Sequence, residues 1–233
     1  MDIGFLGYTQ STPENVQVII KNICGQETTE PDGMVFLLET INTRRIKEDA
    51  EYEGVRVSFQ VRLDTIRINM QIDIGFNDVI TPEAKFIEYP SLLDLTSPKL
   101  RAYNQNTVIA EKVEAMVKLG ALNSRMKDFF DIWTLSRTFP FQAEELNKAI
   151  QATFKQRETE LNGTPAILNP DFDDLEVKQK QWTAFLRKAR LQSIPKDFSI
   201  IANDLKQFLI PVMQKKTKKI GAWEPAGPWL YES

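Results

Sequence analysis

Residues 55–76 read VRVSFQVRLDTIRINMQIDIGF, and apolar and polar side chains alternate along most of this stretch. Strict alternation is typical of a β-strand that buries one face, so the stretch predicts strands at 55–63 and 67–76. The residues between them, Asp64 to Ile66, predict a short hairpin connection. The polar sides of the two strands consist of Arg56, Ser58, Gln60 and Arg62 and of Asn69, Gln71 and Asp73.

The residues before this stretch extend the predicted sheet. The first seven, MDIGFLG, form an apolar, strand-like run with one acid, Asp2, at its tip. A helix is predicted from about 13 to 24, because Ser11 or Thr12 can cap it and Pro13 suits a first helical position. Residues 34–41, MVFLLETI, have strand propensity. The first part of the chain therefore predicts a mixed sheet.

The hydrophobic period changes in the second half of the chain. Across residues 106–139 the apolar side chains fall at spacings of three and four, which predicts two helices separated by a break at Gly120 to Ser124. Further helices are predicted at 142–159, 175–191 and 198–214, with a Pro-, Asn- and Asp-rich loop at 162–174.

These patterns predict an α+β protein with two domains. A sheet domain is expected over residues 1–90, and a helical domain with a C-terminal tail over 91–233, with the changeover near 90–105. The aromatic side chains of Trp223 and Trp229 are expected to pack on the body of the protein, since leaving them in water would be costly.

Composition narrows the chemistry. The 233 residues contain no histidine and a single cysteine, Cys24. This excludes the Ser-His and Cys-His nucleophile systems, internal disulfides and zinc clusters, and it favours Cys24 as a buried small hydrophobe. Catalysis would rest on carboxylates, lysines and arginines, which suit Mg²⁺ and phosphates.

The absence of membrane and export signals, together with the net charge, limits the classes of partner that we expect. There is no long apolar span and no export signal, so we expect a cytoplasmic protein with no membrane partner. The net charge of −3 argues against a nucleic-acid coat, but it does not exclude a local basic groove, because net charge says nothing about how the lysines are distributed. The run KKTKK at 215–219 is either a solvated helix end or a contact to an RNA backbone.

Two acids end apolar strands in similar contexts. Asp2 and Asp73 are each followed by Ile, Gly and Phe. If their strands adjoin, the two carboxylates could hold Mg²⁺, which prefers oxygen ligands and bridges to substrate phosphates. The alternative is that both are turn formers or guards of a sheet edge.

The predicted helix pair over 106–139 concentrates charge. Lys112 lies on the first helix, and Arg125, Lys127, Asp128 and Asp131 lie at the start of the second. Asp128 and Asp131 are three residues apart and therefore neighbours on one helical turn. These residues either form a site or are the exposed ion pairs that decorate most helices.

One segment of this helix pair, AEKVEAMVKLGALNSRMKDFFDIW, resembles the AEK and KD..D segment of the AbiEii/AbiGii-type abortive-infection toxins. These toxins are a branch of the nucleotidyltransferase superfamily related to the minimal nucleotidyltransferases. The stretches EDAEYEGVRVSFQVRL, RINMQIDIGFNDVITP and IEYPSLLDLTSPKLRAYNQNTVIAEK also resemble that family, as does the region from ATFKQRETEL to KQKQWTAFLRK. The resemblance covers nearly the whole chain.

The resemblance implies a nucleotidyltransferase fold, in which a mixed sheet presents acidic side chains to a cleft. A helical domain follows in the chain and borders that cleft. It also implies Mg²⁺ and an NTP, an RNA (tRNA-like) acceptor and a cognate antitoxin. By position, Asp2 and Asp73 correspond to the metal-binding catalytic acids, Lys112 and Asp128 to further catalytic residues, and Lys112, Arg125, Lys127 and Asp131 to nucleotide-binding residues.

The chain departs from the family pattern at its start. Position 4 is glycine where the family has the second acid of an Asp-x-Asp pair, and no residues supply the Gly-rich turn that precedes it. We therefore expect an N-terminally truncated protein whose nucleotide transfer is impaired or lost. The alternatives are a catalytically inactive remnant that binds RNA or an antitoxin, and the product of a decaying gene.

Overall fold

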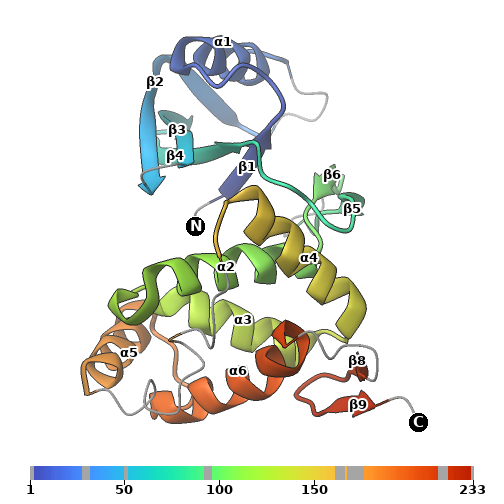
Figure 1. Cartoon of the computed structure of the whole chain (residues 1–233). Coiled ribbons are helices and arrows are strands. Elements are labelled where there is room, and N and C mark those ends of the chain that lie inside the picture. The colour runs from blue at the N-terminus through green and yellow to red at the C-terminus, as the bar shows by residue number, and fades with distance from the viewer. Residues whose placement is uncertain are drawn as a thin grey trace. The chain divides into compact units, whose positions relative to one another are not determined.

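The computed structural model describes residues 3–27, 32–49, 52–91, 96–160, 166, 176–214 and 220–231. The chain divides into two compact units (Figure 1). The sheet unit comprises Met1–Asp78 and Ser91–Thr96, and the helical unit comprises Val79–Pro90 and Ser97–Ser233. The α+β class predicted from the sequence is confirmed.

The sheet unit is built on four strands in the order β1-β4-β3-β2. They are β1 (Ile3–Gly7), β2 (Met34–Asp49), β3 (Tyr52–Leu63) and β4 (Ile66–Phe76). β1 runs parallel to β4, whereas the β2–β3 and β3–β4 pairs are antiparallel, so the sheet is mixed as predicted. The β3–β4 connection is one residue shorter than expected, because Ile66 already pairs with Leu63.

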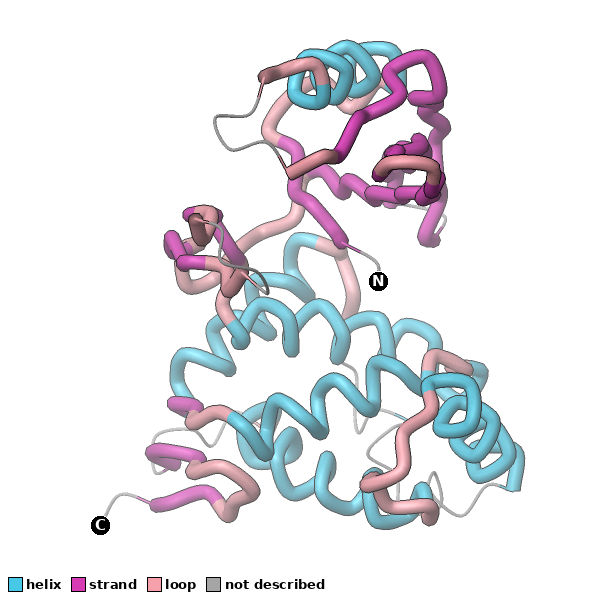
Figure 2. The backbone as a smooth tube through the Cα atoms, turned by 180° about the vertical axis from the view of Figure 1, so that it is seen from behind, coloured by secondary structure: helices cyan, strands magenta, loops and turns pink. Residues whose placement is uncertain are grey.

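Helix α1 (Pro13–Cys24) covers the apolar face of this sheet (Figures 1 and 2). Thr12 is its N-cap, and the backbone N–H of Asn15 donates to the Thr12 hydroxyl at 3.3 Å. The buried core joins α1 to the alternating apolar positions of the strands: Val16, Ile20, Ile41, Val55, Val57, Phe59, Val61 and Phe76. Cys24 is half-buried against this core, and burial raises the pKa of its thiol.

The described residues of the helical unit form five α-helices at the predicted places. They are α2 (Gln105–Leu119), α3 (Met126–Thr138), α4 (Ala143–Gln156), α5 (Glu176–Ala189) and α6 (Phe198–Met213). The predicted break between the first two is a short 3-10 turn, Gly120–Leu122. One core with large buried side chains such as Phe129, Trp182 and Phe208 joins these helices. No helix in the described residues is both long and apolar enough to cross a membrane.

Short strands that the sequence pattern does not predict complete this unit. β5 (Lys85–Glu88) and β6 (Lys99–Ala102) form a hairpin, and β7 (Phe141–Gln142), β8 (Ile220–Trp223) and β9 (Trp229–Tyr231) form a small sheet. The prediction that Trp223 and Trp229 pack on the body is confirmed, because both are 4% exposed. Their indole N–H groups donate to the carbonyls of Ser136 and Phe208 at 2.6 and 2.9 Å. The run at 215–219 and all of 162–174 except Ala166 lie outside the described residues.

Candidate functional site

A row of four residues crosses the polar face of the sheet. Gly4 on β1 pairs with Asp73 on β4, Asp73 pairs with Arg56 on β3, and Arg56 pairs with Arg44 on β2. Side chains of directly opposite residues point to the same face of a sheet. The expectation that the chain start and the Asp73 strand adjoin is therefore confirmed.

Asp73 is held by a bidentate ion pair. The Nε and Nη2 atoms of Arg56 donate to its two carboxylate oxygens, each at 2.7 Å. Both side chains are only about a quarter exposed, at 27% for Arg56 and 26% for Asp73. Two parallel charge-assisted hydrogen bonds are the strongest arrangement between these groups, so Asp73 is fixed in place with both oxygens engaged.

The described residues do not fit a divalent-cation centre at this row. Mg²⁺ requires near-octahedral oxygen ligands, yet the Asp73 oxygens already bind Arg56 and Gly4 supplies no oxygen from a side chain. Among the described residues, no group of three or more acidic, histidine or cysteine side chains is placed to hold a metal. Asp2, the other expected metal ligand and catalytic acid, lies outside the described residues.

Four of the predicted site residues come together in the helical unit. The Lys112 ammonium on α2 lies 2.7 Å from Asp128 Oδ1 and 2.8 Å from Asp131 Oδ2, both on α3. Lys127 also reaches Asp131 Oδ2, at 2.7 Å, but its side chain is 69% exposed. We call these four residues the Lys112 cluster. Burial lowers the pKa of Lys112, but the adjacent carboxylates of Asp128 and Asp131 outweigh it, so the net pKa is raised.

The two carboxylates engage two of the three N–H donors of Lys112. Its side chain is 20% exposed. Arg125, the fifth predicted residue here, is exposed at the start of α3 and makes no ion pair among the described residues.

The ion pairs of Lys112 predict a pH-dependent contribution to stability. Because the folded pKa is raised, this contribution is complete below the ordinary lysine pKa of about 10.4 and is lost as the pH rises through the folded value. We expect Lys112→Met to lower the free energy of unfolding by about 2 kcal/mol near pH 8, as for other hydrogen bonds to charged groups. The gap from the wild type is expected to narrow above about pH 10 in urea titrations.

Lys127→Met is the matched control for this measurement. It removes an exposed lysine from the same acid, Asp131, and surface ion pairs contribute less than about 1 kcal/mol. A gap between wild type and Lys112→Met that widens with rising pH would contradict the raised pKa.

Two basic residues that the sequence reasoning did not assign support these sites. Arg56 is one, and Lys178 on α5 is the other. Lys178 is 2% exposed and donates to the backbone carbonyl of Asn123, whose side chain in turn accepts from the backbone N–H of Arg125 at 2.8 Å. Burial lowers the pKa of Lys178. It therefore anchors the loop from which α3 and its two acids begin.

The sequence contains a pattern from which the positions of Lys178 and Arg56 could have been predicted. Lys178 lies four residues before Trp182 and eight before Leu186, on the stripe of α5 that is buried. Arg56 could be found by counting back from a two-residue hairpin turn, which places it opposite Asp73.

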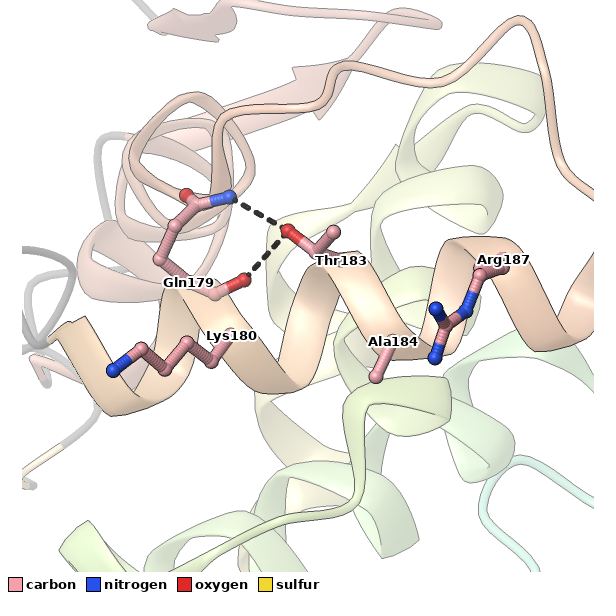
Figure 3. A pocket seen from close by; sticks show the side chains of 5 residues that line it. All are labelled: Gln179, Lys180, Thr183, Ala184 and Arg187. Atoms are coloured by element: carbon pink, nitrogen blue, oxygen red, sulfur yellow. Dashed lines mark hydrogen bonds between the residues drawn. The ribbon is translucent and has the colours of Figure 1, made fainter.

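A hollow on α5 is not a candidate site. Figure 3 shows that the five side chains lining it, Gln179, Lys180, Thr183, Ala184 and Arg187, all belong to this one helix. Gln179 and Thr183 are bound to each other there, at 3.2 Å between Nε2 and Oγ1. Ligand sites are concave and draw side chains from several elements, so successive turns of one helix do not enclose a ligand.

Comparisons with known proteins give a family for this chain. The model described as "Nucleotidyl transferase AbiEii toxin, Type IV TA system" matches residues 1–204. The chain is also similar to a structure described as "Crystal structure of putative nucleotidyltransferase from H. pylori", at 14% identity and a TM-score of 0.44. That alignment covers 92% of this chain and 78% of the other. A search of curated proteins found no match.

Proposed function

Because the chain belongs to the AbiEii nucleotidyl transferase toxin family of type IV toxin–antitoxin systems, we propose that it binds an NTP and an RNA acceptor and transfers nucleotides only weakly. Binding rests on the basic residues of the two units. Weak transfer rests on the residue beside Asp73.

The observation that carries this proposal is the pairing of Gly4 with Asp73. The family resemblance places a second acid at position 4, and the register places that position directly beside Asp73 on the adjoining strand. With glycine there, the bidentate contact from Arg56 neutralises Asp73. A site that must stabilise developing phosphate charge with a divalent ion therefore lacks a carboxylate that would attract it.

We assign the nucleotide-handling roles to the Lys112 cluster and Arg125. In this proposal Lys112, Lys127 and Arg125 bind the phosphates of the NTP, and Asp131 orients both lysines, which it contacts at 2.7 and 2.8 Å. Lysine and arginine stabilise the negative charge of a transferring phosphoryl group. In an active relative, acids at the positions of Asp2 and Asp73 would hold the divalent ion.

The proposed reaction moves NMP to the RNA. A hydroxyl oxygen of the RNA acceptor attacks the α-phosphorus of the NTP, the bond to the pyrophosphate oxygen breaks, and pyrophosphate leaves. Asp128 accepts the proton of the attacking hydroxyl through Oδ2, since Lys112 contacts its Oδ1.

Label transfer tests the proposal. The protein is incubated with each α-labelled NTP, Mg²⁺ and bulk tRNA, beside an active member of the family. We expect RNA retention on a filter but labelling far below that of the active member. Labelling at the active member's rate would contradict weak transfer, and loss of RNA retention would contradict the binding role.

We further propose a cognate antitoxin as a protein partner. The family belongs to toxin–antitoxin systems, and hairpin β5–β6 exposes apolar side chains, with Phe86 76% exposed and Ile87 43%. Co-expression with the protein encoded beside it, followed by gel filtration, is expected to give a complex that Phe86→Ser weakens. Leu122→Ser is the control, because Leu122 is 91% exposed in the same unit. Equal weakening by both changes would contradict docking on the hairpin.

A further inference from the structure

The polar face of the sheet unit carries arginines in opposed pairs. Arg44 on β2 is the direct partner of Arg56 on β3, and Arg62 on β3 is the direct partner of Arg67 on β4. Residues 56 and 62 are an even number of positions apart on β3, so both pairs project from the same face, opposite to the one that α1 covers. We call this surface the arginine face.

Opposed like charges are unfavourable in a sheet, and here they are only partly compensated. Like charges directly opposite each other destabilise a strand pair. Asp73 neutralises Arg56, but Arg44, Arg62 and Arg67 are exposed and make no ion pair with any part of the chain that the structure describes. Such a face gains stability when a ligand supplies negative charge.

Two acids lie at the Arg44–Arg56 end of this face: Asp73 binds Arg56, and Asp78 Oδ2 lies 3.2 Å from the position of a Cβ atom added at Gly75. Two further acids lie near the strands but outside the paired positions of the face. Asp64 lies in the turn between β3 and β4. Glu39 is exposed in the segment of β2 where the register with β3 is interrupted, so the ladder does not place it on either face.

The two arginine pairs are set apart along the sheet. The six residue steps from Arg56 to Arg62 span about 20 Å at roughly 3.3 Å per step. Between the pairs lie side chains with hydrogen-bonding groups: Asn42, Ser58, Gln60, Asn69 and Gln71. Gln60 and Asn69 are joined by a 3.1 Å hydrogen bond between Nε2 and Oδ1. The spacing suits a chain of repeated anions better than one compact anion.

We propose that the arginine face binds the sugar-phosphate backbone of the RNA acceptor, an inference that rests on the proposed function. Arginine forks bind phosphates through paired N–H donors, and amide and hydroxyl side chains hydrogen-bond to sugar and phosphate oxygens. The face binds without preference for sequence, because the β3 and β4 positions between its two arginine pairs, Ser58, Gln60, Asn69 and Gln71, carry no aromatic side chain on which a base could stack.

An acidic protein segment fits this face less well than RNA. The cores of protein–protein interfaces are enriched in aromatic and other apolar anchors. On β3 and β4 the face consists of Arg56, Ser58, Gln60 and Arg62 beside Arg67, Asn69, Gln71 and Asp73. None of these side chains is apolar, and β2 adds Val35 and Leu37, the partners of Arg62 and Gln60, beside Asn42 and Arg44. Two aliphatic side chains among so many polar ones do not make an apolar anchor, so backbone phosphates are the better match.

The experiment measures RNA binding by fluorescence anisotropy, with an end-labelled, unstructured oligouridine as the probe and no NTP. The test variant combines Arg44→Gln, Arg62→Gln and Arg67→Gln, and it keeps Arg56 because that residue holds Asp73. Arg45→Gln is the matched control: Arg45 is exposed on the same strand, but its partner is Val55, on the opposite face.

We expect the triple variant to bind RNA at least about 10-fold more weakly in low salt. The slope of log K against log salt is expected to become shallower by about 2, since each lost phosphate contact on a single strand removes roughly 0.7. Arg45→Gln is expected to leave both quantities at the wild-type values. Thermal unfolding of all three proteins confirms that they are folded.

Several outcomes would overturn the inference. An unchanged slope in the folded triple variant would do so, as would an equal loss in Arg45→Gln. So would unchanged RNA affinity together with lost binding of a polyglutamate peptide, which would assign the face to an acidic protein. If the wild type shows no nucleotide transfer but the triple variant binds RNA more weakly than the wild type, only the proposed transfer would be refuted. RNA labelling by the triple variant at the wild-type rate would refute only the arginine face.

Discussion

Changing Gly4 to aspartate is expected to give the sheet unit a divalent-cation site and to raise nucleotide transfer by about 100-fold, the effect of one well-placed electrostatic group. Gly4 is the register partner of Asp73, and a Cβ atom added at Gly4 meets nothing within 4 Å. The new carboxylate therefore fits beside Asp73. Two adjacent carboxylates attract a divalent ion strongly enough to compete with Arg56 for the Asp73 oxygens.

Two measurements check the Gly4→Asp result. Added Mn²⁺ is expected to raise the unfolding temperature of the variant, since a ligand that binds only the folded state stabilises it. Labelled NTP and bulk tRNA then report transfer. Gly4→Asn is the matched control, because it has the same shape without the charge, and it is expected to show neither effect. A folded Gly4→Asp protein with no response to Mn²⁺, or an equal response in Gly4→Asn, would refute the assignment of position 4.

Replacing Arg157 with methionine is expected to lower the free energy of unfolding of the helical unit by about 3 to 5 kcal/mol. Arg157 directly follows α4, and its Nη1 donates to Glu114 Oε2 on α2 at 2.9 Å. Glu114 is 1% exposed and also accepts from the Thr159 hydroxyl. Without the guanidinium a carboxylate stays buried without its counter-charge, which is more costly than the loss of a surface pair.

A second variant separates this cause from a packing defect. The double change Glu114→Leu with Arg157→Met removes both charges, so we expect it to recover most of the loss in urea unfolding. Lys180→Met removes half of an exposed ion pair with Glu176 on α5 and is expected to leave the midpoint unchanged. A double variant as unstable as Arg157→Met alone would show that lost packing is the cause.

The register of the central hairpin shows where reading the sequence was insufficient. The alternation of apolar and polar residues correctly predicts strands β3 and β4 and the faces that they bury. A three-residue connection ending at Ile66 would place Arg56 opposite Ile74, whereas the observed two-residue turn places it opposite Asp73. Because side chains alternate between faces, a shift of one residue decides whether an arginine meets an acid.

The Lys112 cluster and the Arg56–Asp73 ion pair differ in how much of each could be predicted from the sequence. The spacing of Asp128 and Asp131 on one helix is local, so a sequence pattern reveals it. Their shared contact with Lys112 depends on how α2 and α3 pack, and the ion pair between Arg56 and Asp73 depends on strand register. That the acids of the sheet and these helices face one cleft stays a prediction.

The sequence by itself determined the order of strands β1 to β4 and of the α-helices, the faces they bury and the residues that carry charge, because periodicity, caps and turn residues are local properties. It did not reveal the short strands β5 to β9. Only the tertiary structure decided which charges meet. It set Arg56 against Asp73, placed Gly4 beside that acid and opposed Arg44 to Arg56 across an interrupted ladder. The physical reason is that such contacts join residues distant in the chain through register and packing, and short-range patterns do not encode either.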